Sequence, residues 1–364
     1  MVFYPISRSK FTAITFSAAL MAVSSGVLAQ SYEIRAKIPG LIKPASEVKA
    51  EAFSHTFTNC GQVGRIGPTL AQCQSAYAGS NVLETEYGFD VSNGIQTWVV
   101  PADGTYRIEA FGASGAHQTL GSGYGGKGAA IKGDFKLHAG DIVHVAVGQQ
   151  GRGGPEVSIK YPAGGGGSFV YVDGPPNDPL IVAGGGAGVR SNLSADAHGQ
   201  AGMLAGYASA SANKSGLPGQ HVGVGHGSWI DGSNYQCSGG GAGWLSQGAD
   251  GSRSGTFGVV KSDTSSCGGR GLYGRDVRSS EPLVGGFGSC ATGNDSAHVG
   301  GFGGGGGGGC SGEGGGGGYT GGAGTYADNN HGGGAGSFNA GANQENITGA
   351  NRGHGKVLIK MVSN

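Results

Sequence analysis

Glycine is the feature that most constrains this chain, because 82 of its 364 residues are glycine and many stand in unbroken tracts. The longest tracts span residues 303–309 and 314–318, and shorter ones lie at 164–167, 184–186, 239–241 and 332–334. Glycine loses more conformational entropy on ordering than any other residue, so an isolated tract stays disordered. A folded chain of this sequence must therefore pack glycine backbones against one another, or carry them as flexible linkers.

Three features favour packing over a flexible linker. Aromatic residues interrupt the tracts, cysteines stand beside the longest one, and there are several tracts, so that each has others to pack against. We therefore predict an inserted bundle of polyglycine II helices, which have three residues per turn and bond only to neighbouring segments. The expected structural positions of the bundle are Gly303, Gly306, Gly309, Gly314 and Gly318.

Outside the tracts the sequence predicts β-strands. Residues 105–111 alternate, with Tyr106, Ile108 and Ala110 on one side, which is typical of a half-buried strand. Further strands are expected at 98–100, 129–135, 141–147, 168–172, 180–183 and 356–361. Strand 141–147 is nearly all apolar and should be covered on both faces, and Asp103-Gly104 predicts a hairpin joining 98–100 to 105–111. With one short α-helix at 68–77, the pattern indicates a mainly β sandwich or barrel.

The N-terminus has the layout of a secretory signal peptide. Arg8 and Lys10 precede an uncharged apolar run at 11–23, and small residues at 27–29 form a cleavage site. A transmembrane anchor is the alternative, but the run falls short of the roughly 20 residues that span a bilayer. We expect residues 1–29 to be a cleaved signal peptide, residues 30–52 an irregular lead-in, and the mature chain to be secreted or held at the cell surface without a membrane span.

The cysteine pattern agrees with export. There are six cysteines, an even number, and their spacing contains no C-x-x-C motif, so disulfides are favoured over zinc or redox sites. Free structural thiols are the alternative that the export signal opposes. The cysteines expected in disulfides are Cys60, Cys73, Cys237, Cys267, Cys290 and Cys310. The charged residues balance, with 23 basic and 23 acidic, and nothing predicts a nucleic-acid partner.

The motifs that could indicate catalysis or metal binding are all incomplete. Residues 121–128 nearly fit a phosphate-binding loop, but Gly128 stands where Ser or Thr would reach magnesium, and no βαβ unit surrounds the glycines. His221, His226 and Asp231 lie in a glycine-rich loop whose spacing fixes no metal geometry. His144 is expected to be a partnered side chain of the sandwich. We therefore expect no enzyme activity, no cofactor and no metal.

Several motifs in order along the chain resemble one extracellular family. They are Phe57-Thr58-Asn59-Cys60, Ala71-Gln72-Cys73, Gly94-Ile95-Gln96-Thr97-Trp98, Val147-Gly148-Gln149-Gln150-Gly151, Gly300-Gly301-Phe302 with the tract up to Cys310, and Gly353-His354-Gly355-Lys356-Val357-Leu358-Ile359-Lys360. Together they are similar to the glycine-rich ligand-binding region of anaplastic lymphoma kinase and leukocyte tyrosine kinase. The resemblance covers roughly residues 53–364, and no kinase domain accompanies it.

The resemblance implies a tumour-necrosis-factor-like β-sandwich, or jelly roll, formed by residues 53–183 and 353–364, with the glycine-rich insertion at 184–352. It also implies a Cys60–Cys73 bridge, and by analogy Cys290–Cys310, which leaves Cys237–Cys267. The function it implies is a non-catalytic module that binds an unknown extracellular protein or cell-surface ligand. Two alternatives stay open, a structural or adhesive protein built on packed polyglycine helices and the extracellular part of a receptor-type signalling system.

Overall fold

The computed structural model describes eleven stretches of the chain, which belong to one compact unit, Ala52–Asn364. They are residues 53–84, 88–117, 125–152, 161–173, 179–208, 238–248, 268–269, 282–287, 298–309, 312–325 and 331–363. The predicted signal peptide and lead-in, and the histidine-rich loop with His221, His226 and Asp231, lie outside these stretches.

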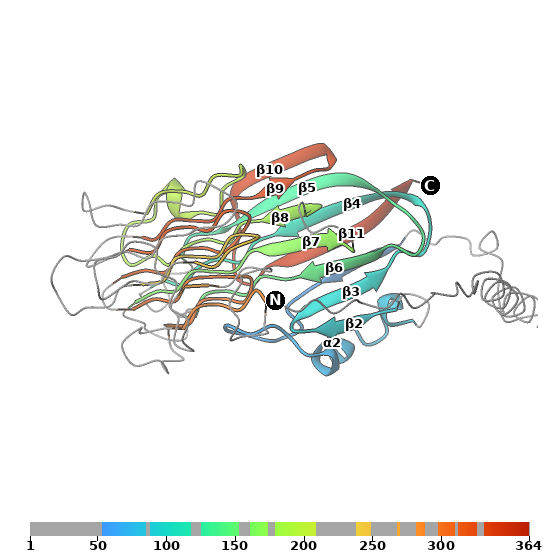
Figure 1. The fold of residues 1–364 in the computed structure, drawn as a ribbon, viewed down its shortest axis with the longest axis horizontal. Helices are drawn as coiled ribbons and strands as arrows, with labels where there is room; N and C mark the ends of the chain where they lie inside the picture. Colours follow the sequence, from blue (N-terminus) through green and yellow to red (C-terminus); the bar gives the residue numbers. More distant parts are fainter. Residues whose placement is uncertain are drawn as a thin grey trace, which may run out of the picture. The chain divides into compact units, whose positions relative to one another are not determined.

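Two antiparallel sheets form the mainly β part of the protein (Figure 1). The five-stranded sheet has the order β1 (Ser54–Phe57), β11 (Lys356–Ser363), β4 (Gly104–Phe111), β5 (Gly128–Leu137) and β10 (Ala342–Asn351). The six-stranded sheet has the order β2 (Asp90–Ser92), β3 (Ile95–Val99), β6 (Ile142–Ala146), β7 (Ser168–Val172), β8 (Ile181–Ala183) and β9 (Phe338–Asn339). The first and last strands of the described chain thus pair, since β1 lies beside β11.

One hydrophobic core lies against both sheets. The predicted alternation of β4 is confirmed, because Tyr106, Ile108 and Ala110 are fully buried. Trp98 of the other sheet is also fully buried, stacks on Phe53 with 4.2 Å between ring centroids, and meets the Tyr106 ring edge-on at 5.7 Å. Large rings from both sheets therefore meet in the middle of the core, where they bury the most apolar area per residue.

The predicted hairpin between strands 98–100 and 105–111 is wrong. β3 pairs with β2 and β6, whereas β4 pairs with β11 and β5, so the Asp103-Gly104 turn carries the chain from one sheet to the other. The turn signal specified a change of direction, but it did not specify which strand would be the hydrogen-bonding partner. One edge of β4 pairs with β11 from the far end of the chain, and the other pairs with β5, the next strand in the sequence.

Two further expectations about the strands need correction. The chain returns to the sheets before residue 353, because β9 and β10 occupy 338–351 within the predicted insertion. β6 is not covered on both faces along its length, since Ile142 is 39% exposed and His144 is half-buried. β10 was not predicted because its sequence is polar and shows no apolar alternation. The first seven of its ten residues are all exposed.

Among the described residues the one α-helix is α2 (Leu70–Ala76), and it begins where the sequence placed a helix. Thr69 is its N-cap, and Thr69 and Gln72 form a capping box in which each side chain accepts from the other's backbone N–H. Two short 3₁₀ turns, η1 (Asn81–Leu83) and η3 (Ala195–Ala197), begin at Ser80 and Ser194 in the same way, with a serine hydroxyl accepting from the backbone.

The described glycine segments lie side by side beyond the ends of the strands (Figure 1), and we call them the glycine layer. Its members lie within residues 112–117, 125–127, 147–152, 161–167, 184–189, 199–206, 238–242, 300–309, 312–325 and 331–336. Nearly all of these glycines are buried. Their backbone groups bond to other segments of the layer, which satisfies polar groups that are out of reach of water.

The hydrogen bonds of residues 314–319 repeat every third residue. The N–H groups of Gly314 and Gly317 donate to the segment 162–165, and the next pair, Gly315 and Gly318, donates to the segment 239–242. The third pair, Gly316 and Tyr319, donates to the segment 333–336. One extended segment is thus bonded to three neighbours at once, which a flat β-sheet does not allow.

Candidate binding face

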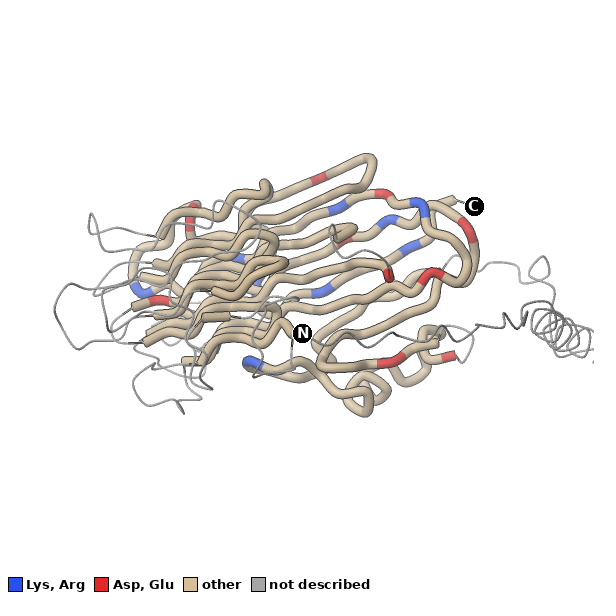
Figure 2. The backbone as a smooth tube through the Cα atoms, viewed as in Figure 1, with Lys and Arg blue, Asp and Glu red and all other residues tan. Residues whose placement is uncertain are grey.

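The outer face of the five-stranded sheet is the candidate functional site, and we call it the binding face. Its side chains are those that point away from the core on β1, β11, β4, β5 and β10, and antiparallel pairing places them in rows across the strands. Figure 2 shows charged residues of both signs along these strands. Side chains on a regular sheet hold fixed spacings, so the face is a preformed pattern of charge and apolar surface.

The first row combines a cation with apolar side chains. In register across four strands stand Lys356, Phe111, Ala130 and Ile347. The Lys356 ammonium lies 4.8 Å from the centroid of the Phe111 ring, and Ile347 is 56% exposed. Cation–π attraction therefore holds Lys356 over Phe111 while the Ile347 side chain stays open to solvent.

The second row is held by a shared lysine. Thr56, Leu358, Glu109, Lys132 and Glu345 stand in register. The Lys132 Nζ lies 3.1 Å from Glu345 Oε1 and 3.9 Å from Glu109 Oε1, so one ammonium bridges carboxylates of two neighbouring strands. These groups are partly exposed, and each pair contributes at most about 1 kcal/mol. Their larger effect is to neutralise one another.

The third row contains the closest ion pair of the face. Arg107 Nε and Nη2 donate to the two carboxylate oxygens of Asp134 at 2.6 and 2.7 Å, and Asn343 Nδ2 donates to Asp134 Oδ2 at 2.9 Å. These hydrogen bonds, those from Arg107 first, lower the pKa of the Asp134 carboxyl to about 2. Ser54 and Lys360 complete the row on β1 and β11.

Some charged side chains of the binding face are paired with one another, and others are not. Arg107, Lys132, Glu109, Asp134 and Glu345 are all engaged in ion pairs. Within the described part of the chain, no carboxylate lies within 4.0 Å of the ammonium groups of the remaining three cations, which are Lys136, Lys356 and Lys360. All three are exposed, so the face carries an excess of positive charge that is available to a partner.

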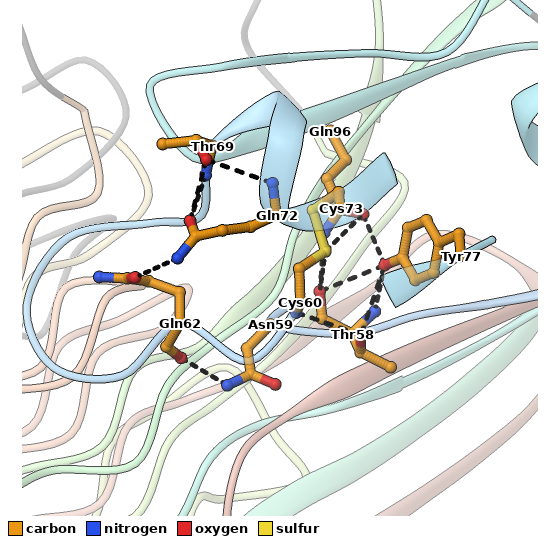
Figure 3. Close-up of a disulfide and its surroundings, with 9 residues drawn as sticks. All are labelled: Thr58, Asn59, Cys60, Gln62, Thr69, Gln72, Cys73, Tyr77 and Gln96. Atoms are coloured by element: carbon orange, nitrogen blue, oxygen red, sulfur yellow. Dashed lines mark hydrogen bonds between the residues drawn. A yellow bond between two sulfur atoms is a disulfide. The ribbon is translucent and has the colours of Figure 1, made fainter. Parts of the chain in front are cut away.

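A disulfide joins the segment that follows β1 to α2 and forms a corner with the side chains around it (Figure 3). Cys60 and Cys73 form a disulfide with 4.9 Å between their Cα atoms, which joins the chain after β1 to α2 and confirms the predicted pair. Beside it the Tyr77 hydroxyl donates to Gln96 Oε1 at 2.7 Å and accepts from the Thr58 N–H at 2.7 Å. Gln96 is fully buried on β3, so this polar cluster ties the corner to the six-stranded sheet.

His55 lies in the same corner on the inward side of β1. It is 8% exposed, its Nδ1 is 3.0 Å from Ser80 Oγ, and its ring meets those of Phe57 and Tyr77 edge-on. Burial lowers the pKa of His55 from 6.5 to about 4, because the charged imidazolium loses its hydration there. The imidazole is therefore neutral in the folded protein at physiological pH.

The structure brings together two motifs that are distant in the sequence. Gln149 donates through its backbone N–H to Phe302 O at 2.8 Å and through Nε2 to Ile66 O at 2.9 Å. The Phe302 ring in turn fills the space over Gly67 and Gly94, where an added Cβ would lie within 3.0 Å of it. Sequence alone gave no sign of these contacts, because they join four separate segments.

The predicted structural glycines are all described. Gly303 adopts φ +96°, a conformation that side chains rarely take, and a Cβ on Gly306 or Gly314 would lie 2.2 or 2.1 Å from a backbone oxygen. A Cβ on Gly318 would lie 2.6 Å from Gly336 O, and Gly309 pairs with Gly312 in a short bridge. The remaining predicted cysteines, Cys237, Cys267, Cys290 and Cys310, lie outside the described residues.

His144 has partners, as expected of a sandwich side chain. Its Nε2 lies 2.5 Å from Asp173 Oδ1, and its ring stacks on Tyr171. Across the described stretches, no group of three or more His, Cys, Asp or Glu side chains is arranged to hold a metal ion. The helices of the same stretches are all too short or too polar to cross a membrane.

Comparison with known proteins shows similarity to a receptor. Over 108 residues, or 28% of the chain, the sequence is 38% identical to the leukocyte tyrosine kinase receptor of Mus musculus. The match spans 12% of that receptor's length. No protein-family model matches the chain. The similarity indicates a domain related to part of that receptor, in agreement with the resemblance of the sequence motifs.

Proposed function

We propose that the protein is a non-catalytic binding module that acts outside the cell, and that the binding face carries its ligand. The observation that carries this proposal is the 38% identity to the leukocyte tyrosine kinase receptor, together with motifs that resemble the glycine-rich extracellular region of that family. We assign the similarity to the extracellular part of the receptor. The kinase activity in the receptor's name is not transferred.

The architecture we propose for the module is a tumour-necrosis-factor-like sandwich with an inserted polyglycine II bundle. Two antiparallel sheets on one core support the sandwich. The three-residue repeat of hydrogen bonds along residues 314–319 supports the bundle, since polyglycine II has three residues per turn and bonds only to its neighbours. In this role the bundle stiffens one end of the sheets and spaces the binding face from other parts of an assembly.

We also propose that the protein is exported from the cell. Residues 1–29 act as a cleaved signal peptide, and the mature chain is secreted or stays at the cell surface. The buried Cys60–Cys73 disulfide supports this, because such bridges form and persist in oxidising compartments. N-terminal sequencing of the exported protein should begin at Gln30, and an N-terminus at Met1 in the exported fraction would contradict it.

Capture of partners tests the function. The purified protein, biotinylated at its C-terminus, is incubated with extracellular and cell-surface fractions at increasing concentration. A discrete partner whose capture saturates is expected. Self-association of the protein without such a partner would refute a ligand-binding module and favour the structural or adhesive alternative, in which the glycine layer is itself the functional material.

A further inference from the structure

The outward side chains of β11 alternate between lysine and apolar residues. Lys356, Leu358, Lys360 and Val362 all point away from the core, and Val362 is 44% exposed. Lys356 and Lys360 are four positions apart, which spans about 13 Å along a strand. The strip formed by these four side chains thus repeats charge and apolar surface with the period of an extended polypeptide.

Within the described residues the two lysines of the strip make no ion pair, and Lys356 has only its cation–π contact with Phe111. Nearby carboxylates are taken by other cations, because Asp134 pairs with Arg107 at 2.6 Å and Glu109 shares Lys132 with Glu345. Lys360 stands in register with Arg107, whose charge is balanced by Asp134, so the unbalanced positive charge of β11 comes from Lys356 and Lys360 themselves. Removing Lys360 would therefore cost the fold little, removing Lys356 would cost it one exposed cation–π contact, and both ammonium groups can attract an anion.

From this pattern we propose that the β11 strip docks an extended polypeptide segment in which acidic and apolar residues alternate. Carboxylates four residues apart would face Lys356 and Lys360, while an apolar side chain between them would cover Leu358. An anionic polysaccharide or an anionic membrane would use the lysines but not the apolar residues between them. The assignment rests on the proposed binding function and names the chemistry of its ligand.

The test uses the purified full-length protein and a fluorescein-labelled probe peptide, Glu-Thr-Val-Thr-Glu-Thr-Val-Thr-Glu. Fluorescence anisotropy should show saturable binding that weakens as the salt concentration rises, because exposed charge pairs are screened. The double variant K356Q/K360Q should bind the probe about tenfold more weakly. The matched variant K356R/K360R, which keeps both charges, should bind it within twofold of the parent. A peptide of the same composition with its three glutamates adjacent should bind more weakly.

Three results of the binding measurements would overturn the assignment, and the capture experiment adds a fourth. One is equal binding of the probe to the parent and K356Q/K360Q. The others are tighter binding of heparin, or of vesicles containing phosphatidylserine, than of the probe. All variants should melt within about 3 °C of the parent, because both lysines are exposed and K356Q/K360Q loses only the cation–π contact with Phe111. If K356Q/K360Q captures the extracellular partner as well as the parent does, the strip is not the docking site, but the proposed binding function stands. If the parent protein captures no partner, the proposed binding function itself is refuted.

Discussion

Replacing Gly306 by alanine adds a single methyl group to the centre of the glycine layer. The new Cβ would lie 2.2 Å from Gly239 O and 2.8 Å from Gly239 C, both of them backbone atoms. Comfortable separations between such atoms are about 3.5 Å. The segments of Gly306 and Gly239 would therefore have to move apart by about 1 Å, because a backbone held by its own hydrogen bonds cannot rotate away as a side chain does.

The cost follows from what that movement disturbs. Overpacking a tight interior costs about 1–3 kcal/mol. The shift also stretches the bond from Gly315 N to Gly239 O, now 3.1 Å, and a hydrogen bond contributes about 1 kcal/mol net. Alanine also lowers the conformational entropy of the unfolded chain, which offsets about 0.4–1 kcal/mol of this loss of stability. The expected net loss is about 2–3 kcal/mol, which lowers the melting temperature by roughly 3–5 °C in a chain of this size.

Gly202→Ala is the matched control, since it makes the same chemical change in the same layer. A Cβ on Gly202 would meet no atom within 4 Å, and its backbone does not have a positive φ. That variant should unfold at the parent temperature or slightly above it. Thermal unfolding followed by near-ultraviolet circular dichroism, with limited proteolysis at 25 °C, measures both variants. If Gly306→Ala matches Gly202→Ala in melting temperature and protease resistance, the glycine layer is not packed as argued.

The remaining predictions concern the disulfide-linked corner and its histidine. Replacing both Cys60 and Cys73 by serine should lower the free energy of unfolding by about 3 kcal/mol, because the bridge closes a loop with a sequence separation of 13 residues; an unchanged urea midpoint would argue against this. The pKa of His55 is about 4 in the folded protein and 6.5 in the unfolded chain. Between these two pH values His55 is protonated in the unfolded chain and neutral in the folded protein. Stability should therefore fall as the pH drops through that window, by up to about 3 kcal/mol. The loss should be smaller in His55→Gln, and parallel melting curves of the two proteins from pH 7 to pH 4 would contradict it.

Elements with strong local signals were predictable from the sequence. The alternation around Tyr106 identified β4 and its buried side, and a helix was expected at 68–77, where the structure places α2 behind a Thr69–Gln72 capping box. The Cys60–Cys73 pair was also foreseen, on the strength of a resemblance rather than of spacing. Glycine content by itself required that the tracts either pack together or remain unstructured.

Partner choice between distant segments was decided only by the tertiary structure. The Asp103-Gly104 turn reverses the chain whether or not its flanking strands pair, so its sequence could not reveal that β3 and β4 belong to different sheets. β10 joins its sheet despite a polar sequence because β5 offers it a hydrogen-bonding edge. The binding face exists for the same reason, since its rows are assembled from strands up to about 300 residues apart in the chain. A single sequence records what each residue prefers locally, whereas hydrogen-bonding edges and the close approach of glycine backbones are properties of segments that meet only when the whole chain has folded.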